Sequence, residues 1–254
     1  MQKFIKQITH QAGQIILEKF GKVGVKYTKL DAADVVTEAD LAANDYLVEQ
    51  IISKYPDHGI ISEERGESKT DAEYVWIIDP LDGTRNYSIG TPLFGVMVGL
   101  VWKGEMVMGA ICDPTHNQLV FAEIGQGAYL NDKKIKCSET KEWEHSYGLG
   151  FTTINEKTAS IYSKLINSVF QEPFWMNSFG CAAFAGIQVA SGKRDWLLSL
   201  HDSVWDDAAR VVVLKEAGCQ VTDLAGQPWT LKSRGMIAAN PHLHKKLLEV
   251  ITKK

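Results

Sequence analysis

A buried strand that ends in a cluster of oxygen ligands constrains the fold of this chain more than any other feature. The run 74–78, Tyr-Val-Trp-Ile-Ile, is apolar, β-branched and aromatic, which is typical of a strand inside a sheet. The hexapeptide 79–84, Asp-Pro-Leu-Asp-Gly-Thr, follows it directly, and we expect Pro80 to end the strand and fix a turn. The strand therefore delivers two carboxylates to its carboxyl end, where open α/β sheets usually carry their chemistry.

The spacing inside the hexapeptide suits a metal ion that holds a phosphate. Asp79 and Asp82 are three residues apart, so a tight turn can direct both at one point, with the Leu81 carbonyl between them. Gly83 allows close approach of the backbone, and the hydroxyl and N–H of Thr84 can face an anion if a helix starts there. Hard oxygen ligands beside an anion site favour Mg²⁺.

Two other interpretations of the hexapeptide are weaker. Asp-Pro and Asp-Gly are ordinary turn dipeptides, but a plain turn rarely gathers so many oxygen ligands. The aspartyl-phosphate nucleophile of haloacid-dehalogenase-type phosphatases has the pattern Asp-x-Asp-Gly-Thr. Here the pattern is Asp-x-x-Asp-Gly-Thr, and the extra residue would move the second carboxylate to another position on the turn.

Three segments together resemble the inositol monophosphatase family: the hexapeptide 79–84, the pair Glu63-Glu64 upstream and the pair Trp205-Asp206 downstream. The hexapeptide is highly specific, and the resemblance covers nearly the whole chain with the segments in the right order. It implies an α/β fold of mixed α+β character, a layered αβαβα sandwich of the sugar-phosphatase type. We expect one catalytic unit, 1–254, made of an N-terminal half (about 1–145) and a C-terminal half (about 146–254).

The hydrophobic pattern agrees with two halves of different character. The first half has predicted helices at 4–20 and 37–55, which flank a largely antiparallel set of strands at 59–62, 74–78, 92–102, 106–111 and 119–122. The second half has predicted helices and strands that alternate, at 159–170, 181–190, 196–200, 204–217, 219–222, 236–239 and 241–251. Residues 23–34 are polar and predict an exposed loop or hairpin, and 143–153 is ambiguous.

Composition excludes several classes of protein. The chain carries 27 basic and 31 acidic residues, a net charge of −4, with no long basic run, so nucleic acid is not an expected partner. Its four cysteines are widely spaced, which indicates reduced thiols in a cytoplasmic protein rather than a zinc site or a disulfide framework. No apolar run suits a signal peptide or a membrane span, so no membrane association is expected.

The resemblance implies a metal-ligand set and a catalytic pair. The expected ligands are carboxylates and one backbone carbonyl: Glu63, Asp79, Leu81, Asp82 and Asp206. Oxygen ligands favour Mg²⁺, with Mn²⁺ as a possible substitute, and so many carboxylates in one pocket imply two or three ions. Asp40, which the sequence alone places in a capping box with Thr37, is expected to activate the attacking water with Thr84, and Glu63 to act beside them.

The sequence alone also allows ordinary structural roles, without metal binding, for these acidic residues. Without the resemblance, Glu63 and Glu64 would be a solvated loop, and Asp206 would be an acid that interacts favourably with a helix dipole. Asp207 would then cap the same helix or form a salt bridge. The resemblance reverses these interpretations only for Glu63 and Asp206, and makes Glu64 an additional acidic group.

The substrate contacts implied by the resemblance include two departures from the family pattern. The expected contacts are Asp82, Gly83, Thr84, Gly180, Cys181, Ala182, Ser199 and Asp206. Cys181 stands where the family commonly has threonine, and Ser199 stands where inositol-specific members have a glutamate that binds ring hydroxyls. His201 or Asp202 would compensate only if the loop shifts, and His201 by itself is typical of a surface or packing residue.

These residues predict hydrolysis of a phosphomonoester by direct attack of a metal-activated water. The expected substrate is a small polyol or sugar phosphate, with inositol-1-phosphate as the first candidate. The two departures, and the similarity of 92–95, Pro-Leu-Phe-Gly, to the histidinol-phosphatase branch, leave histidinol phosphate, fructose-1,6-bisphosphate, 3′-phosphoadenosine nucleotides and NADP open. The resemblance further implies a homodimer and inhibition by lithium.

A protein of a different class also stays open at this point. The chain would then be a non-catalytic regulatory protein that keeps the fold, binds metal and binds a protein or RNA. An acidic overall charge and a complete set of carboxylate ligands argue against this as the sole role. A cluster of buried carboxylates is costly unless cations use it.

Overall fold

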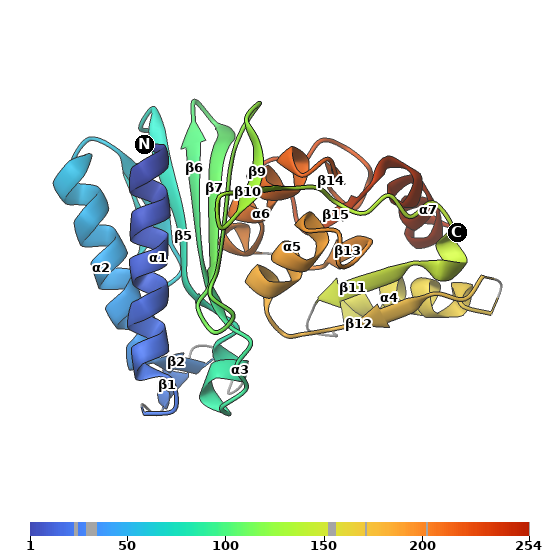
Figure 1. Ribbon diagram of the computed structural model, residues 1–254, viewed down its shortest axis with the longest axis horizontal. Helices are drawn as coiled ribbons and strands as arrows, with labels where there is room; N and C mark the ends of the chain where they lie inside the picture. Colours follow the sequence, from blue (N-terminus) through green and yellow to red (C-terminus); the bar gives the residue numbers. More distant parts are fainter. Residues whose placement is uncertain (23–24, 29–34, 152–155, 171, 202, 254) are drawn as a thin grey trace.

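The computed structural model describes residues 1–254 except 23–24, 29–34, 152–155, 171, 202 and 254. Helices and sheets alternate in layers across the molecule (Figure 1). This arrangement confirms the predicted αβαβα sandwich. Within the described residues, no helix combines the length and the apolar character that are needed to cross a bilayer.

Among the described residues, eight strands form the first sheet, in the order β10-β9-β8-β7-β6-β5-β3-β4. Neighbouring strands are antiparallel except β3 and β5, which are parallel. The strands are β3 (Gly59–Ser62), β4 (Gly66–Ser68), β5 (Tyr74–Asp82), β6 (Gly95–Trp102), β7 (Glu105–Asp113), β8 (Gln118–Glu123), β9 (Gly127–Leu130) and β10 (Lys133–Ile135). The largely antiparallel sheet is therefore confirmed, whereas the short strands β4, β9 and β10 were not predicted.

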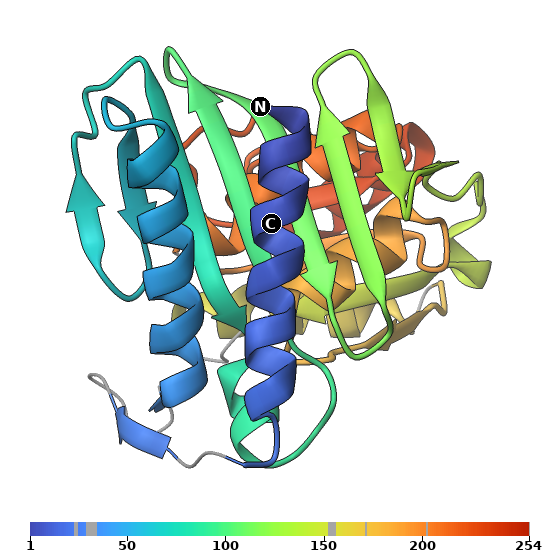
Figure 2. The ribbon, with the colours of Figure 1, turned by 60° about the vertical axis from the view of Figure 1, so that its left-hand side comes forward.

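Helices α1 (Gln2–Lys19) and α2 (Glu38–Lys54) cover one face of this sheet, as Figure 2 shows. The predicted apolar stripe of α1 is buried against α2 and the sheet, with Ile5, Ile8 and Ile16 almost inaccessible to solvent. Strands β1 (Val25–Thr28) and β2 (Val35–Thr37) pair antiparallel before α2, which confirms a hairpin there, although much of 23–34 lies outside the described residues.

A second sheet of five strands, within the described part of the chain, has the order β12-β11-β13-β15-β14. Helices α5 (Ala182–Ala190) and α6 (Val204–Glu216) lie between the two sheets, and α4 (Glu156–Ser168) and α7 (Pro241–Thr252) cover the outer face (Figure 1). The strands are β11 (Tyr147–Phe151), β12 (Trp175–Asn177), β13 (Trp196–Ser199), β14 (Gln220–Thr222) and β15 (Met236–Ala239). The ambiguous stretch 143–153 contains β11 and the 3₁₀ turn η1 (Trp143–His145).

Small residues bring α6 into close contact with the first sheet. A Cβ at Gly109 of β7 would come within 2.3 Å of the Ala209 carbonyl oxygen, and one at Gly99 of β6 within 3.4 Å of Ala208 Cβ. Ala208 and Ala209 are themselves almost fully buried. This close packing fixes α6 across the sheet, so its first turn reaches the end of β5.

The expectation that Pro80 ends the strand is wrong. Strand β5 continues to Asp82, and its register against β6 changes between Asp79, which pairs with Met97, and Asp82, which pairs with Gly95. Three steps along β5 thus match two along β6, which is a β-bulge. Proline is tolerated at a bulge because its missing N–H is not needed in the ladder.

Candidate metal centre and active site

Three carboxylates from distant parts of the chain meet where β5 ends. Among the described residues, Asp79 and Asp82 of β5 and Asp206 of α6 each place an oxygen within 4.8 Å of the others. Asp79 and Asp82 are buried, and the Asp206 side chain is 16 % exposed. The bulge directs the two β5 acids, and the close packing of α6 brings the third. The structure therefore brings these three predicted ligands together.

The electrostatics of this group favour the binding of a positive charge. Burial raises the pKa of Asp79 well above its ordinary value, and the charges of Glu63, Asp82, Asp206 and Asp40 raise it further. Burial and the charges of Asp82 and Glu63 do the same to the pKa of Asp206. Asp79 Oδ1 is buried and accepts no hydrogen bond from any described residue. An all-oxygen donor set with an unsatisfied anionic atom fits a hard divalent cation.

Glu63 and Leu81 lie beside this group. Glu63 follows β3, the parallel neighbour of β5, and its N–H donates to the Ile78 carbonyl at 3.3 Å. Its charge raises the pKa values of Asp79 and Asp206, so it lies near both, although it is not one of the mutually close carboxylates. The Leu81 carbonyl accepts the Thr84 hydroxyl at 2.9 Å. Both residues can complete the donor set.

Asp40 and Thr84 form a hydrogen-bonded pair next to the carboxylates. The capping box is present, because Asp40 Oδ2 accepts the Thr37 N–H at 2.8 Å while Thr37 Oγ1 accepts the Ala39 N–H. The other oxygen, Oδ1, lies 3.2 Å from Thr84 Oγ1. Asp40 therefore has both roles, since one oxygen caps α2 and the other faces Thr84. Burial raises the pKa of Asp40 to about 6, against the lowering effect of its bonds to Thr37.

Gly83 turns the chain from β5 into the short helix α3 (Thr84–Ser88). Its φ is +82°, and a Cβ there would come within 2.8 Å of the Leu93 carbonyl oxygen. Both the left-handed backbone and the close approach require glycine. A helix therefore begins at Thr84, two residues after the second aspartate, which is the condition that the sequence set for an anion site at this point.

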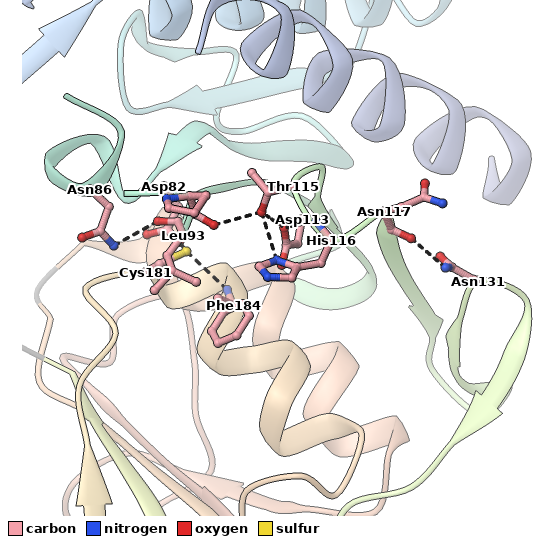
Figure 3. A network of polar contacts seen from close by, with 11 residues as sticks. Asp82, Asn86, Leu93, Asp113, Thr115, His116, Asn117, Asn131, Cys181 and Phe184 are labelled. Atoms are coloured by element: carbon pink, nitrogen blue, oxygen red, sulfur yellow. Dashed lines mark hydrogen bonds and ion pairs between the residues drawn. The ribbon is translucent and has the colours of Figure 1, made fainter. Parts of the chain in front are cut away.

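Asp82 joins the first sheet to the middle helical layer. Its Oδ2 accepts the Ala183 N–H at 2.6 Å and the Cys181 thiol at 2.8 Å, so this carboxylate caps α5 (Figure 3). Burial raises the pKa of Asp82, and these hydrogen bonds oppose the rise. Asn86 of α3 makes a second link, donating to the Leu93 and Phe179 carbonyls at 3.0 and 2.7 Å. The segment before α5 is thereby held against the site.

Comparison with known proteins identifies the family. The model of the inositol monophosphatase family matches residues 1–254. The chain belongs to the inositol monophosphatase family. A protein of Aquifex aeolicus called fructose-1,6-bisphosphatase/inositol-1-monophosphatase is 37% identical over 243 residues, which are 95% of this chain and 91% of that protein. A putative Nus factor SuhB of Neisseria meningitidis serogroup B is 32% identical over 245 residues, which are 95% of this chain and 94% of that protein.

Solved structures agree with the family assignment. The extragenic suppressor protein SuhB of Bartonella henselae has a TM-score of 0.91 and 30% identity, with 99% of this chain and 98% of that chain covered. An inositol monophosphatase (IMPase) of Thermotoga maritima has a TM-score of 0.89 and 29% identity, with 99% and 96% covered. Together, the family and the relatives indicate a phosphatase, and the family is generally metal-dependent.

Ser199 does not lie where the sequence argument expected it. Its side chain is 0 % exposed, and its hydroxyl contacts Asp207 Oδ1 and Arg210 Nη2, each at 3.1 Å. A hydroxyl that is fully buried and engaged in this way does not face a substrate. The expected contact is therefore corrected to a structural role, because the packing of α6 decides where position 199 points.

The three expected substrate contacts in the segment 180–182 differ in their exposure to solvent. Cys181 and Ala182 are 0 % exposed, and the Cys181 thiol is committed to Asp82. These buried side chains do not make the expected contact with substrate, because the Cys181 thiol donates to Asp82 and both residues lie at the start of α5. Gly180 is exposed, with a φ of +63°. Of these three residues, only Gly180 is exposed to an approaching ligand.

Two features of the site were missed or undervalued. His201, expected at the surface or in packing, places its Nδ1 3.6 Å from Asp206 Oδ2, while Asp202 lies outside the described residues. Arg210 was not singled out, although it forms a buried ion pair with Asp207 and thereby confirms a salt bridge for that acid. The i,i+3 spacing of Asp207 and Arg210 on a predicted helix was the available signal.

Proposed function

We propose that this chain is a Mg²⁺-dependent phosphomonoesterase that acts on a small polyol or sugar phosphate, with inositol-1-phosphate as the first candidate. The observation that carries the proposal is the group of Asp79, Asp82 and Asp206, in which a buried Asp79 oxygen has no partner among the described residues. Beside this group lies a hydroxyl–carboxylate pair, Thr84 and Asp40. A phosphatase needs both a place for cations and a group that handles a proton.

The carboxylates and one carbonyl would hold the cations. Two or three Mg²⁺ ions, with Mn²⁺ as a substitute, would be bound by Glu63, Asp79, the Leu81 carbonyl, Asp82 and Asp206. When bound, the ions supply Lewis-acid polarisation of the phosphate and neutralise charge that develops on it. The raised pKa values of Asp79 and Asp206 support this assignment, because ionised forms of both need a neighbouring positive charge.

Thr84 and Asp40 would prepare the attacking water. Thr84 Oγ1 lies 2.9 Å from the Leu81 carbonyl oxygen and 3.2 Å from Asp40 Oδ1, and its single hydroxyl proton can be donated to only one of them at a time. When that proton is donated to Asp40, an Oγ1 lone pair can accept a hydrogen bond from the attacking water. Asp40 is held in place by Thr37, which keeps the pair oriented. The N–H groups of Gly83 and Thr84, at the start of α3, are suited to phosphate oxygens. No side chain of this set is needed as a covalent nucleophile.

A panel of phosphate esters tests the proposal. Release of phosphate would be measured from inositol-1-phosphate, fructose-1,6-bisphosphate, histidinol phosphate, 3′-phosphoadenosine-5′-phosphate and NADP, each with Mg²⁺ and with EDTA. The expected result is release that requires Mg²⁺ and is fastest for one of the first two compounds. Preference for a later compound would correct the substrate, and no release by folded, Mg²⁺-loaded protein would contradict the proposal.

A regulatory role is the second candidate. The observation in its favour is that a relative with 32% identity over almost the whole chain is called a putative Nus factor SuhB. A regulator would keep the fold and the cation site and show no turnover. Measured turnover on any phosphomonoester separates the two classes, because a non-catalytic protein releases no phosphate whatever the cation.

Three further expectations belong to the same proposal. We propose that the protein is a homodimer, that lithium inhibits it and that it is cytoplasmic. Light scattering after size-exclusion chromatography tests the first, and phosphate release in a lithium titration tests the second. Fractionation of the source cells tests the third.

A further inference from the structure

A fully buried arginine lies next to the carboxylate group. Arg210 of α6 is 0 % exposed and follows Asp206 by one helical turn. Its Nε donates to the Asp206 carbonyl oxygen at 2.6 Å. Its Nη2 donates to Asp207 Oδ1 at 2.5 Å and to Ser199 Oγ at 3.1 Å. The guanidinium is therefore fixed to the residue that supplies one of the three close carboxylates.

The neighbouring elements make room for this guanidinium. A Cβ at Gly186 of α5 would come within 2.9 Å of Arg210 Cδ, so a larger residue there would collide with the arginine stem. Ser199 of β13, which is small and buried, accommodates the other side. Gly186 and Ser199 thus leave the space in which the positive charge of Arg210 sits within the protein.

The pair with Asp207 does not satisfy Arg210 completely. Arg210 Nη1 is buried and has no hydrogen-bond partner among the described residues. The field of the guanidinium extends to the metal-binding acids, because it opposes the upward pKa shifts of both Asp82 and Asp206. A positive charge at this place competes with any cation that the same carboxylates attract.

We propose that Arg210 is a fixed counter-charge of the carboxylate group, which limits how tightly divalent cations bind at Asp82 and Asp206. The inference rests on the metal site of the proposed function. Arg210 acts through the acids and does not touch substrate, so it is a positioning residue. A tethered monovalent cation neutralises part of the cluster, and the remaining attraction holds a divalent ion less tightly than the bare carboxylates would.

The test compares variants in a background without a buried unpaired acid. Removal of Arg210 alone leaves Asp207 uncompensated and risks unfolding. We therefore compare Asp207→Asn with Arg210→Met against Asp207→Asn alone, which keeps the arginine. The two variants differ by one positive charge, because a guanidinium stays protonated even when it is buried. Mn²⁺ binding is measured from the paramagnetic resonance signal of free Mn²⁺, and circular dichroism checks the fold. The Met variant is expected to bind Mn²⁺ more tightly, by about tenfold or more.

The direction of the change makes the result decisive. A purely structural role of Arg210 would loosen Asp206 and weaken Mn²⁺ binding, so tighter binding has no structural explanation. Equal or weaker binding by the Met variant, when the wild type binds Mn²⁺, overturns this inference and leaves the proposed function intact. Failure of the wild type to bind Mn²⁺ overturns both.

Discussion

Asp79 lies where the negative charge of the site is most concentrated. It is 1 % exposed, and burial is the largest cause of its raised pKa, followed by the charges of Glu63, Asp82, Asp206 and Asp40 in that order. The buried oxygen without a partner belongs to the same residue. A cation at this place would therefore relieve both the repulsion and the unsatisfied acceptor.

The substitution Asp79→Asn tests this at the residue scale. The amide has nearly the same shape but no charge, so we expect phosphate release to fall by more than about a hundredfold while the protein stays folded. The metal-free variant is expected to be at least as stable as the wild type, because a repelling charge has been removed. Steady-state phosphate release and thermal unfolding in EDTA measure the two effects.

Asp195→Asn is the matched control. Asp195 is also buried, but its carboxylate accepts the Tyr147 N–H, and among the described residues it is not grouped with Asp79, Asp82 and Asp206. Its amide can still accept that hydrogen bond, so activity is expected to stay within about threefold of the wild type. Wild-type-like activity of Asp79→Asn, or equal losses in both variants, would contradict the role given to Asp79.

The residues that the sequence predicted well are those whose chemistry is local. Asp79 and Asp82 are only three residues apart and lie on either side of one bulge in β5, so both reach the same place. Ser199 was placed by its match to the glutamate position of inositol-specific members, and such a match says nothing about the direction of the side chain. The direction depends on Arg210 and Asp207, which surround the Ser199 hydroxyl only after α6 has packed.

At the scale of elements, the turn between β5 and α3 depends on Gly83. Gly83 and Gly90, which flank α3, have similar left-handed backbones, with φ of +82° and +80°. A Cβ at Gly83 would come within 2.8 Å of the Leu93 carbonyl, whereas a Cβ at Gly90 would meet nothing within 4 Å. The two glycines thus separate backbone strain from steric conflict.

Alanine at each position is expected to give different results. Gly90→Ala should cost about 1 kcal/mol of unfolding free energy, from backbone strain alone, and leave activity near the wild-type level. Gly83→Ala should cost at least about 2 kcal/mol and reduce phosphate release, because the collision displaces Asp82 and Thr84. Chemical denaturation and enzyme assays check both, and equal effects at the two positions would contradict the steric explanation.

Element boundaries were less predictable than element types. From the sequence, we predict a strand before Asp79 that ends at Pro80. In the structure, β5 continues through a bulge to Asp82. A proline rule describes regular ladders, and it does not show that the β6 partner accommodates an extra residue. The short strands β4, β9 and β10 were not predicted because few of their side chains are buried, so they carry little hydrophobic pattern.

At the scale of the whole molecule, the site is assembled where the two sheets and the middle helical layer meet. Asp206 reaches Asp79 only because α6 packs closely on β6 and β7. Asp82, at the end of β5 in the first sheet, caps α5 in the neighbouring helical layer. Cations would therefore join elements from both halves of the chain. The stability of the whole protein should depend on them.

The stabilising effect of Mg²⁺ is expected to increase with pH. In the metal-free protein, the pKa of Asp40 is raised from 3.8 to about 6, and those of Asp79 and Asp206 are raised well above 3.8. The folded state then binds more protons than the unfolded state, so these groups lower stability as pH rises from about 4 through their folded pKa values. Bound Mg²⁺ removes that loss for Asp79 and Asp206, because protons and cations compete for the same oxygens.

Thermal unfolding with Mg²⁺ and with EDTA measures this difference. The rise in Tm caused by Mg²⁺ should be small near pH 5 and several degrees near pH 7.5, and Asp79→Asn should reduce it at the higher pH. The histidines whose pKa values are lowered, His58 and His244, titrate in both samples and cancel from the comparison. A Mg²⁺ effect that is independent of pH would contradict the carboxylate assignment.

The most direct test of the central claim is a crystal of this protein soaked in Mn²⁺, with anomalous scattering recorded to locate the ions. We expect anomalous peaks about 2.0–2.3 Å from carboxylate oxygens of Asp79, Asp82 and Asp206. Glu63 and the Leu81 carbonyl should complete the ligands. The peaks should be absent from the same site in Asp79→Asn. Peaks only elsewhere, or none in a crystal of protein that Mn²⁺ activates, would contradict the claim that these carboxylates form the metal centre.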